Sequence, residues 1–173
     1  MAVFPSALFA GGSAFDGARF GSEAVFSDAR FSGAASFTEV RFDGEALFNE
    51  TRFSETAWFA GVQCGNDAVF NGAEFTDAWF GGAHFGAMAW FGGAHFTDDA
   101  VFNGARFGGD AGFGGARFNA AWFGGTRFEA ATCENPLRRR TGDLPTRTEP
   151  GATSSSKTAA DPRRAQSEAA RRR

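Results

Sequence analysis

The chain has 173 residues, including 23 Phe, 24 Gly and no Tyr, and its formal net charge is −3. Its length suits one domain with a tail. Two cysteines are too few for a disulfide framework, and no stretch approaches the roughly 20 apolar residues of a membrane-spanning helix. The charge is divided, because residues 1–133 carry seven Arg and 15 acids, whereas residues 134–173 carry ten Lys or Arg and five acids.

The first residues, MAVFPSALFAGG, are only weakly similar to a signal peptide, because no basic segment precedes the apolar residues. Ala2–Phe4 and Ala7–Phe9 already have the Ala-x-Phe spacing that recurs throughout the next 120 or so residues. We therefore assign this segment to the folded domain, and we expect a cytoplasmic protein.

The main pattern in the sequence is a repeat centred on Phe. Starting at Phe4, the centres follow one another at steps of five or six residues, and they number 25 when Cys64 and Cys133 are included in phase. The residue two positions before the centre is Ala in 20 of the 25. The steps mostly alternate, so the unit is 11 residues long, as in GSEAVFSDARF (21–31). The predicted core ladder includes Phe26, Phe31, Phe37, Phe42, Phe48, Phe53, Phe59, Phe70, Phe75 and Phe80.

An 11-residue period is compatible with helix in principle. However, the pairs GG, DG, NG and SG recur between the centres, and Gly at this density disfavours a long helix. Gly, Asn, Asp and Ser at fixed offsets favour turns. In an extended segment, residues two apart point to the same side, so Ala and Phe would both face inward. The pattern predicts short strands joined by tight turns.

With a small residue two positions before a central Phe, the sequence resembles the pentapeptide repeat family over residues 2–133. The resemblance implies an all-β, right-handed quadrilateral β-helix with four pentapeptides per coil. Twenty-five centres then predict about six coils and a rod about 30 Å long. The chain departs from the family pattern by having Arg, Val or Trp before the centre, and by having nine six-residue steps. It is most similar to the Phe-rich members with longer spacing.

The residue before each centre should point outward, because it follows the strand alternation. Before even-numbered centres it is mostly Arg, and before odd-numbered centres it is mostly apolar. Every Arg of the repeat and every Trp of the chain occupies this position. Four centres per coil therefore predict two opposite polar faces and two opposite apolar faces.

One apolar face should carry Ser36 and the candidate interaction surface, which consists of Trp58, Trp79, Val101 and Trp122. The other apolar face should carry Val25, Leu47, Val69 and Trp90. A contiguous apolar patch indicates a contact with a partner or with a second copy. The alternative is that these side chains only pack on one another as cross-strand ladders.

The extra residue of the six-residue steps is often acidic. Glu23, Glu45, Asp67 and Asp110 should form one acidic corner, interrupted by Met88. Three interpretations remain open for this corner: solubility, imitation of nucleic acid, and cation binding.

No active site is evident. His84 and His95 should lie on opposite faces, so they should not share a metal. Cys64 and Cys133 replace Phe at centres, which predicts buried and inert thiols about 15 Å apart. No phosphate-binding loop with its Lys is present. We expect no cofactor, no metal and no small-molecule substrate.

The composition changes at Asn135–Pro136, where Phe disappears and Pro, Ser, Thr and Arg become frequent. This predicts a β-helix domain over 1–133 and a basic, disordered tail over 134–173. Arg138–Arg140 and Arg171–Arg173 could contact nucleic acid, anionic lipid or the acidic domain.

The function that we expect is a non-enzymatic scaffold that binds another protein through a flat outward face. The resemblance implies an alternative, since some pentapeptide repeat proteins imitate duplex DNA and bind DNA gyrase. The Arg columns argue against that alternative. A regulatory or membrane-associated module is a third class, for which the sequence shows no hydrophobic anchor.

Overall fold

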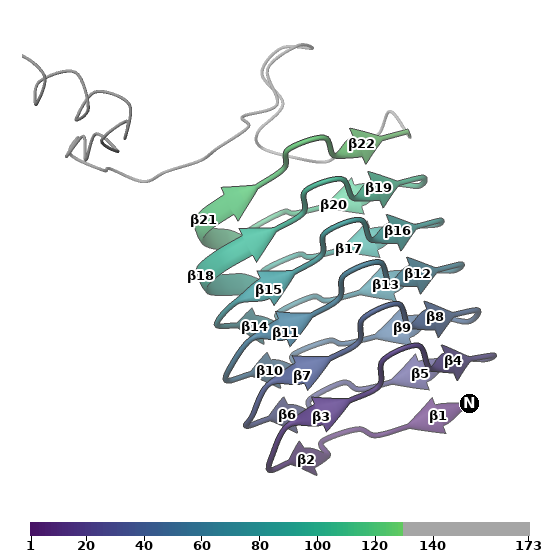
Figure 1. Cartoon of the computed structure of the whole chain (residues 1–173), viewed down its shortest axis with the longest axis vertical. Coiled ribbons are helices and arrows are strands. Elements are labelled where there is room, and N and C mark those ends of the chain that lie inside the picture. The colour runs from purple at the N-terminus through teal and green to yellow at the C-terminus, as the bar shows by residue number, and fades with distance from the viewer. Residues whose placement is uncertain (130–173) are drawn as a thin grey trace, which may run out of the picture.

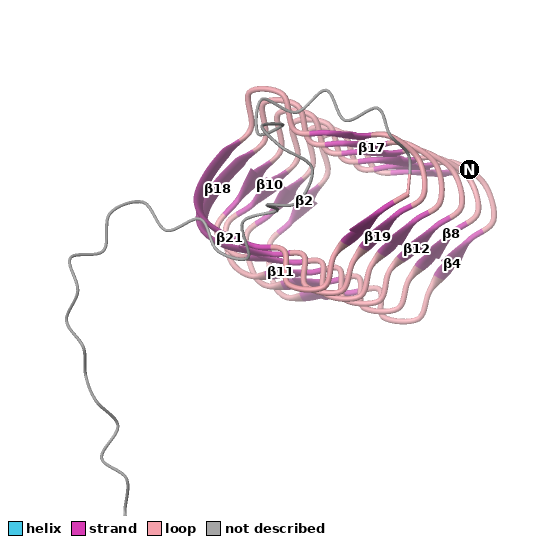
Figure 2. Ribbon diagram, turned by 90° about the horizontal axis from the view of Figure 1, so that it is seen from above, coloured by secondary structure: helices cyan, strands magenta, loops and turns pink. Residues whose placement is uncertain are grey.

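The computed structural model describes residues 1–129, which form a right-handed, four-sided β-solenoid of about six parallel coils (Figures 1 and 2). Cys133 and the predicted tail, 134–173, lie outside the described residues. Each strand pairs in parallel with the strand one coil away, so residues 21 or 22 apart in the sequence become neighbours. The predicted repeat fold is confirmed, and it decides which side chains share a face.

Two faces carry apolar outward residues. The Val face is named after Val25, and the Trp face after Trp79. The Val face contains β1 (Ala2–Val3), β5 (Ala24–Val25), β9 (Ala46–Leu47), β13 (Ala68–Val69), β17 (Ala89–Trp90) and β20 (Ala111–Gly112). The Trp face contains β3 (Ser13–Ala14), β7 (Ala35–Ser36), β11 (Ala57–Trp58) and β15 (Ala78–Trp79), followed by the last residues of β18 (His95–Val101) and β21 (Arg117–Trp122).

The other two faces carry polar outward residues. The Arg30 face contains β2 (Leu8–Phe9), β6 (Arg30–Phe31), β10 (Arg52–Phe53) and β14 (Glu74–Phe75), followed by the first residues of β18 and β21. The Arg41 face contains β4 (Arg19–Phe20), β8 (Arg41–Phe42), β12 (Gln63–Cys64), β16 (His84–Phe85), β19 (Arg106–Phe107) and β22 (Arg127–Phe128). Strand β18 continues around a corner and joins the Arg30 and Trp faces into one ten-stranded sheet.

The corners that follow odd-numbered centres are tight turns. After each odd-numbered centre the step is five residues, and the centre's carbonyl accepts the N–H three residues later, as Phe80 does from Ala83 at 3.0 Å. The third residue of this turn has positive φ, as in a type II turn. In the later coils it is Gly, for example Gly82 at +66°. In the earlier coils Asp28, Glu39 and Glu50 adopt the same conformation.

The core is a set of four Phe columns, one behind each face. Within a column the rings stack almost in parallel, as Phe59, Phe80 and Phe102 do with centroids 4.9 Å apart. Between columns most ring pairs meet edge to face, as Phe80 and Phe91 do at 5.5 Å, and the others are tilted. Stacked and edge-to-face rings are both favourable arrangements for aromatic pairs. Each buried ring contributes roughly 1.5–3 kcal/mol through burial of apolar surface.

Small side chains fill the space beside the rings. The Ala two positions before a centre is buried throughout the middle of the rod. Thr51 occupies this position in one repeat, and its hydroxyl donates to the carbonyl of Phe26 at 2.8 Å. In the described part of the chain, no buried polar side-chain atom lacks a hydrogen-bond partner.

Candidate interaction surface

The Trp face presents its largest apolar side chains one above the other. Trp58 is in register with Trp79, Trp79 with Val101, and Val101 with Trp122. The side chains of Trp58 and Trp79 are exposed, at 37% and 42%, whereas Trp122 is half-buried. Two indoles that are adjacent and exposed on a flat sheet form an apolar patch, and such a patch marks a site of interaction.

Val101, which the sequence placed on this surface, is only 8% exposed although it points outward. It lies in register between Trp79 and Trp122, whose larger side chains flank it. Val101 therefore supports the neighbouring indoles and offers little area of its own to a partner. The structure puts the accessible part of the surface at Trp58 and Trp79.

The opposite Val face is different, because the side chain of its Trp packs against the neighbouring coil. Trp90 is half-buried, and its indole lies against Gly112 in the next coil. Val25, Leu47 and Val69 are half-buried as well. This face therefore follows the alternative interpretation, in which apolar side chains cover one another along the rod.

The residues of the predicted acidic corner form a column beside the Val face, and Met88 occupies the position between Asp67 and Asp110. The carbonyls of Glu45, Asp67 and Asp110 each accept an N–H from the coil before. Among the four acids of this corner, only Glu45 is exposed, and the others are half-buried. The carboxylate of Asp67 accepts the N–H of Met88 at 3.1 Å, so this acid also has a structural role.

Corner side chains recur as acceptors for the next coil, a feature that the sequence reasoning missed. The amides of Asn71 and Asn103 accept the N–H groups of Gly92 and Gly124, at 2.8 and 2.6 Å. Asp77 accepts the N–H of Asp99 at 3.2 Å. Asp or Asn one coil before the residue that it caps is the sequence signal that could have revealed these contacts.

The comparison with family models agrees with this geometry. The model described as pentapeptide repeats (9 copies) matches residues 4–52, 26–74, 48–95 and 91–135, which together cover most of the chain. The chain belongs to the pentapeptide repeat family. No curated protein and no solved structure matched it. The family match therefore confirms a repeat scaffold.

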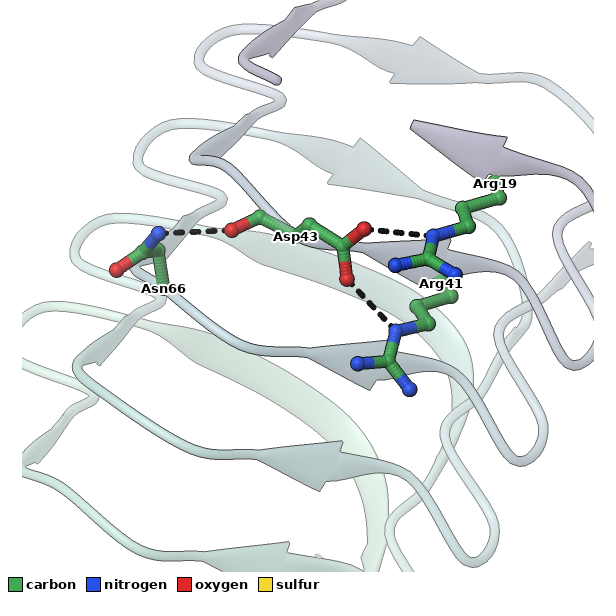
Figure 3. Close-up of polar contacts among 4 residues, drawn as sticks. All are labelled: Arg19, Arg41, Asp43 and Asn66. Carbon is green, nitrogen blue, oxygen red and sulfur yellow. Dashed lines mark hydrogen bonds and ion pairs between the residues drawn. The ribbon is translucent and has the colours of Figure 1, made fainter. Parts of the chain in front are cut away.

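This pentapeptide repeat protein carries ion pairs on its polar faces. Asp43 lies between Arg19 and Arg41, and accepts a hydrogen bond at 2.7 Å from the Nε of each (Figure 3). Hydrogen bonds from Arg41 and Arg19 lower the pKa of Asp43 below its ordinary value. Asn66 donates to the carbonyl of Asp43 at 2.8 Å and so fixes the turn. Three charged groups are thus held together across two coils.

The Arg30 face of the pentapeptide repeat rod has a shallow groove beside it. It has a volume of about 840 Å³ and lies along the turn column of Ser6, Asp28 and Glu50. Arg52 in this groove pairs with Glu74 of the next coil at 2.8 Å. Its polar groups have both signs of charge, so the groove does not select a ligand of one charge.

The remaining candidate groups do not converge. His84 and His95 are exposed on the Arg41 and Arg30 faces, which are opposite each other. Cys64 is buried in the Arg41-face column, and burial raises the pKa of its thiol to about 12. Among residues 1–129, no group of three or more His, Cys, Asp or Glu side chains is placed to hold a metal ion. No helix in this region is long and apolar enough to cross a membrane.

Proposed function

We propose that this pentapeptide repeat protein is a non-enzymatic scaffold that binds another protein through its Trp face. The observation that carries the proposal is the pair of exposed indoles, Trp58 and Trp79, in register on adjacent strands. Trp is one of the residue types enriched among the energetically dominant residues of protein interfaces. A solenoid also holds such residues on a rigid surface, so little ordering is needed on binding.

The test is affinity capture from the native cell with the full chain and with Trp79→Ser. Trp79→Ser should abolish the capture of at least one protein, because it removes the most exposed indole of the patch. Leu8→Ser is the matched control, since Leu8 is 67% exposed but lies on the Arg30 face. Circular dichroism must show the same β-structure in both variants. If Trp79→Ser captures the same proteins as the unchanged chain, the proposal is wrong.

A second copy of the chain is one candidate partner for this face. Sedimentation of the full chain distinguishes it from a different protein. A dimer that Trp79→Ser converts to monomer would identify self-association through the Trp face. A monomer at all concentrations would assign the face to another protein.

Imitation of DNA toward DNA gyrase is the weaker candidate. In its favour are the acids of residues 1–133, which outnumber Arg by 15 to seven. Against it are the guanidinium groups on two opposite faces, because a DNA mimic needs a continuous negative potential. A gyrase supercoiling assay tests it, and no inhibition at tens of micromolar protein would exclude this function.

A further inference from the structure

The charges of the rod are separated along its axis. Residues 53–105 contain six acids and no Lys or Arg, so all seven Arg of the repeat lie before or after this segment. We name residues 53–105 the acidic belt. In Figure 1 it is the middle of the rod, from β11 to β18. Both exposed indoles, Trp58 and Trp79, lie within it.

Within the belt, the acids border the Trp face on one side. The corner that leads from the Arg30 face to the Trp face carries Glu55, Asp77, Asp98 and Asp99. Glu55 and Asp98 are exposed. The opposite corner of the Trp face has no charged residue in these coils, and consists of Ala60–Gly61, Gly81–Gly82 and Asn103–Gly104. The apolar patch therefore has one edge lined by acids of the belt and one edge without a charged residue of the belt, where the side chain of Glu39 from the preceding coil reaches Gly61.

Two of these acids are held in place along the edge of the Trp face, and one of them contacts the indole of Trp122. The carboxylate of Asp77 accepts the N–H of Asp99, and the Nε1–H of Trp122 donates to the carboxylate of Asp99 at 3.5 Å. Carboxylates that are already fixed next to aromatic rings lose little freedom when a cation arrives. Such an arrangement favours a planar, weakly hydrated cation that can contact a ring and a carboxylate together.

We propose that the protein bound by the Trp face presents an extended, arginine-rich segment to the acidic belt. This inference rests on the proposed function of the Trp face. Guanidinium groups meet both requirements of this surface, since they stack on indoles and pair with carboxylates. An extended segment fits because Trp58 and Trp122 are three coils apart, or about 14 Å, which about five extended residues span. Phosphate-bearing ligands are disfavoured by the charge of the belt.

The experiment is a fluorescence titration of the full chain with a synthetic peptide of alternating Arg and Val, acetylated and amidated at its ends. All four Trp of the chain lie in the solenoid, so indole emission reports binding directly. The expected result is saturable binding with a change in Trp emission. The peptide with Glu in place of Arg should not bind.

Paired variants decide whether the belt itself is recognised. Asp77→Asn with Asp98→Asn should weaken binding about tenfold, and Trp79→Ser should weaken it to a similar degree. Asp77→Asn keeps an oxygen acceptor for the N–H of Asp99. Glu23→Gln with Glu45→Gln removes the same charge from the acidic corner beside the Val face, outside the belt, and should change binding less than twofold. Circular dichroism checks that each variant is folded.

Three outcomes would overturn the proposal. One is an Arg–Val peptide that fails to bind. Another is equal weakening by the two double variants, since this indicates attraction by net charge alone. The third is binding that appears only after Arg138–Arg140 are changed to Glu, because the chain's own basic segment would then be the occupant. If the peptide fails while Trp79→Ser still loses a captured protein, only the arginine-rich partner is wrong and the Trp-face function stands.

Discussion

A Cβ atom on Gly112 would lie 2.3 Å from Cε3 of Trp90, so the indole of one coil rests directly on the backbone of the next. Gly112 is the outward residue of β20 and is in register with Trp90 of β17. Any side chain at this position would occupy the space of the ring. The glycine therefore allows Trp90 to lie flat and half-buried on the Val face.

We predict that Gly112→Ala lowers the free energy of unfolding by about 1–3 kcal/mol, because it forces the indole out of its place. The emission of Trp90 should also shift to longer wavelength as the ring becomes solvated. Urea unfolding and fluorescence measure the two effects. Gly114→Ala is the control in the same coil, since nothing lies within 4 Å of its added Cβ. An equal effect of the two substitutions would contradict the prediction.

Removing one ring from the middle of a Phe column should be strongly destabilising. Phe80 is fully buried and stacks on Phe59 and Phe102 at 4.9 Å. Phe80→Ala should lower the free energy of unfolding by about 3–5 kcal/mol, through lost burial and a residual cavity. Phe4, in the first coil, is only partly buried, and Phe4→Ala should cost less than half as much. Urea denaturation followed by circular dichroism compares them, and equal losses would show that the column is not a continuous core.

The turn between the Trp face and the Arg41 face allows backbone strain to be separated from packing. Gly82 has φ of +66° and open space around its Cβ position, so Gly82→Ala introduces strain without a clash. It should cost about 1–2 kcal/mol. Gly81→Ala, one residue earlier, has no positive φ and meets only ordinary contact, so it should change stability by less than about 0.5 kcal/mol. Thermal or urea unfolding measures both, and a neutral Gly82→Ala would contradict the assigned turn.

The ion pairs of Asp43 predict a pH dependence. Arg41 and Arg19 lower the pKa of Asp43, so its carboxylate stabilises the fold above the ordinary pKa of 3.8, and this contribution is lost as the pH falls through the lower folded-state pKa. Carbon NMR of the carboxyl group should give a pKa below 3.8 in the full chain. Arg41→Gln should raise it, because the largest of the lowering interactions is removed. An unchanged pKa in Arg41→Gln would show that this pair does not form in solution.

Much of the fold could be predicted because the same pattern of residues recurs in every repeat. Phe26 and Phe48 are four centres apart, which places them at equivalent positions in adjacent coils, and their rings stack with centroids 4.9 Å apart. The assignment of Trp58 and Trp79 to one face follows from counting four centres per coil. The contribution of Val101 could not be predicted, because its burial depends on the size of its two flanking side chains. The interactions of Asp43 were also missed, because they depend on the direction in which a corner turns.

The sequence by itself determined the coil period, the inward Phe columns and the distribution of outward residues over four faces. These follow from an alternation of inward and outward side chains that is repeated about 25 times, so one irregular repeat does not change the assignment of the others. Only the tertiary structure decided which outward residues are accessible. It exposed Trp58 and Trp79, laid Trp90 on Gly112, and fixed Asp77 and Asp99 beside the Trp face. The physical reason is that exposure and side-chain contacts depend on neighbours one coil away, whose size and orientation are set by packing between coils.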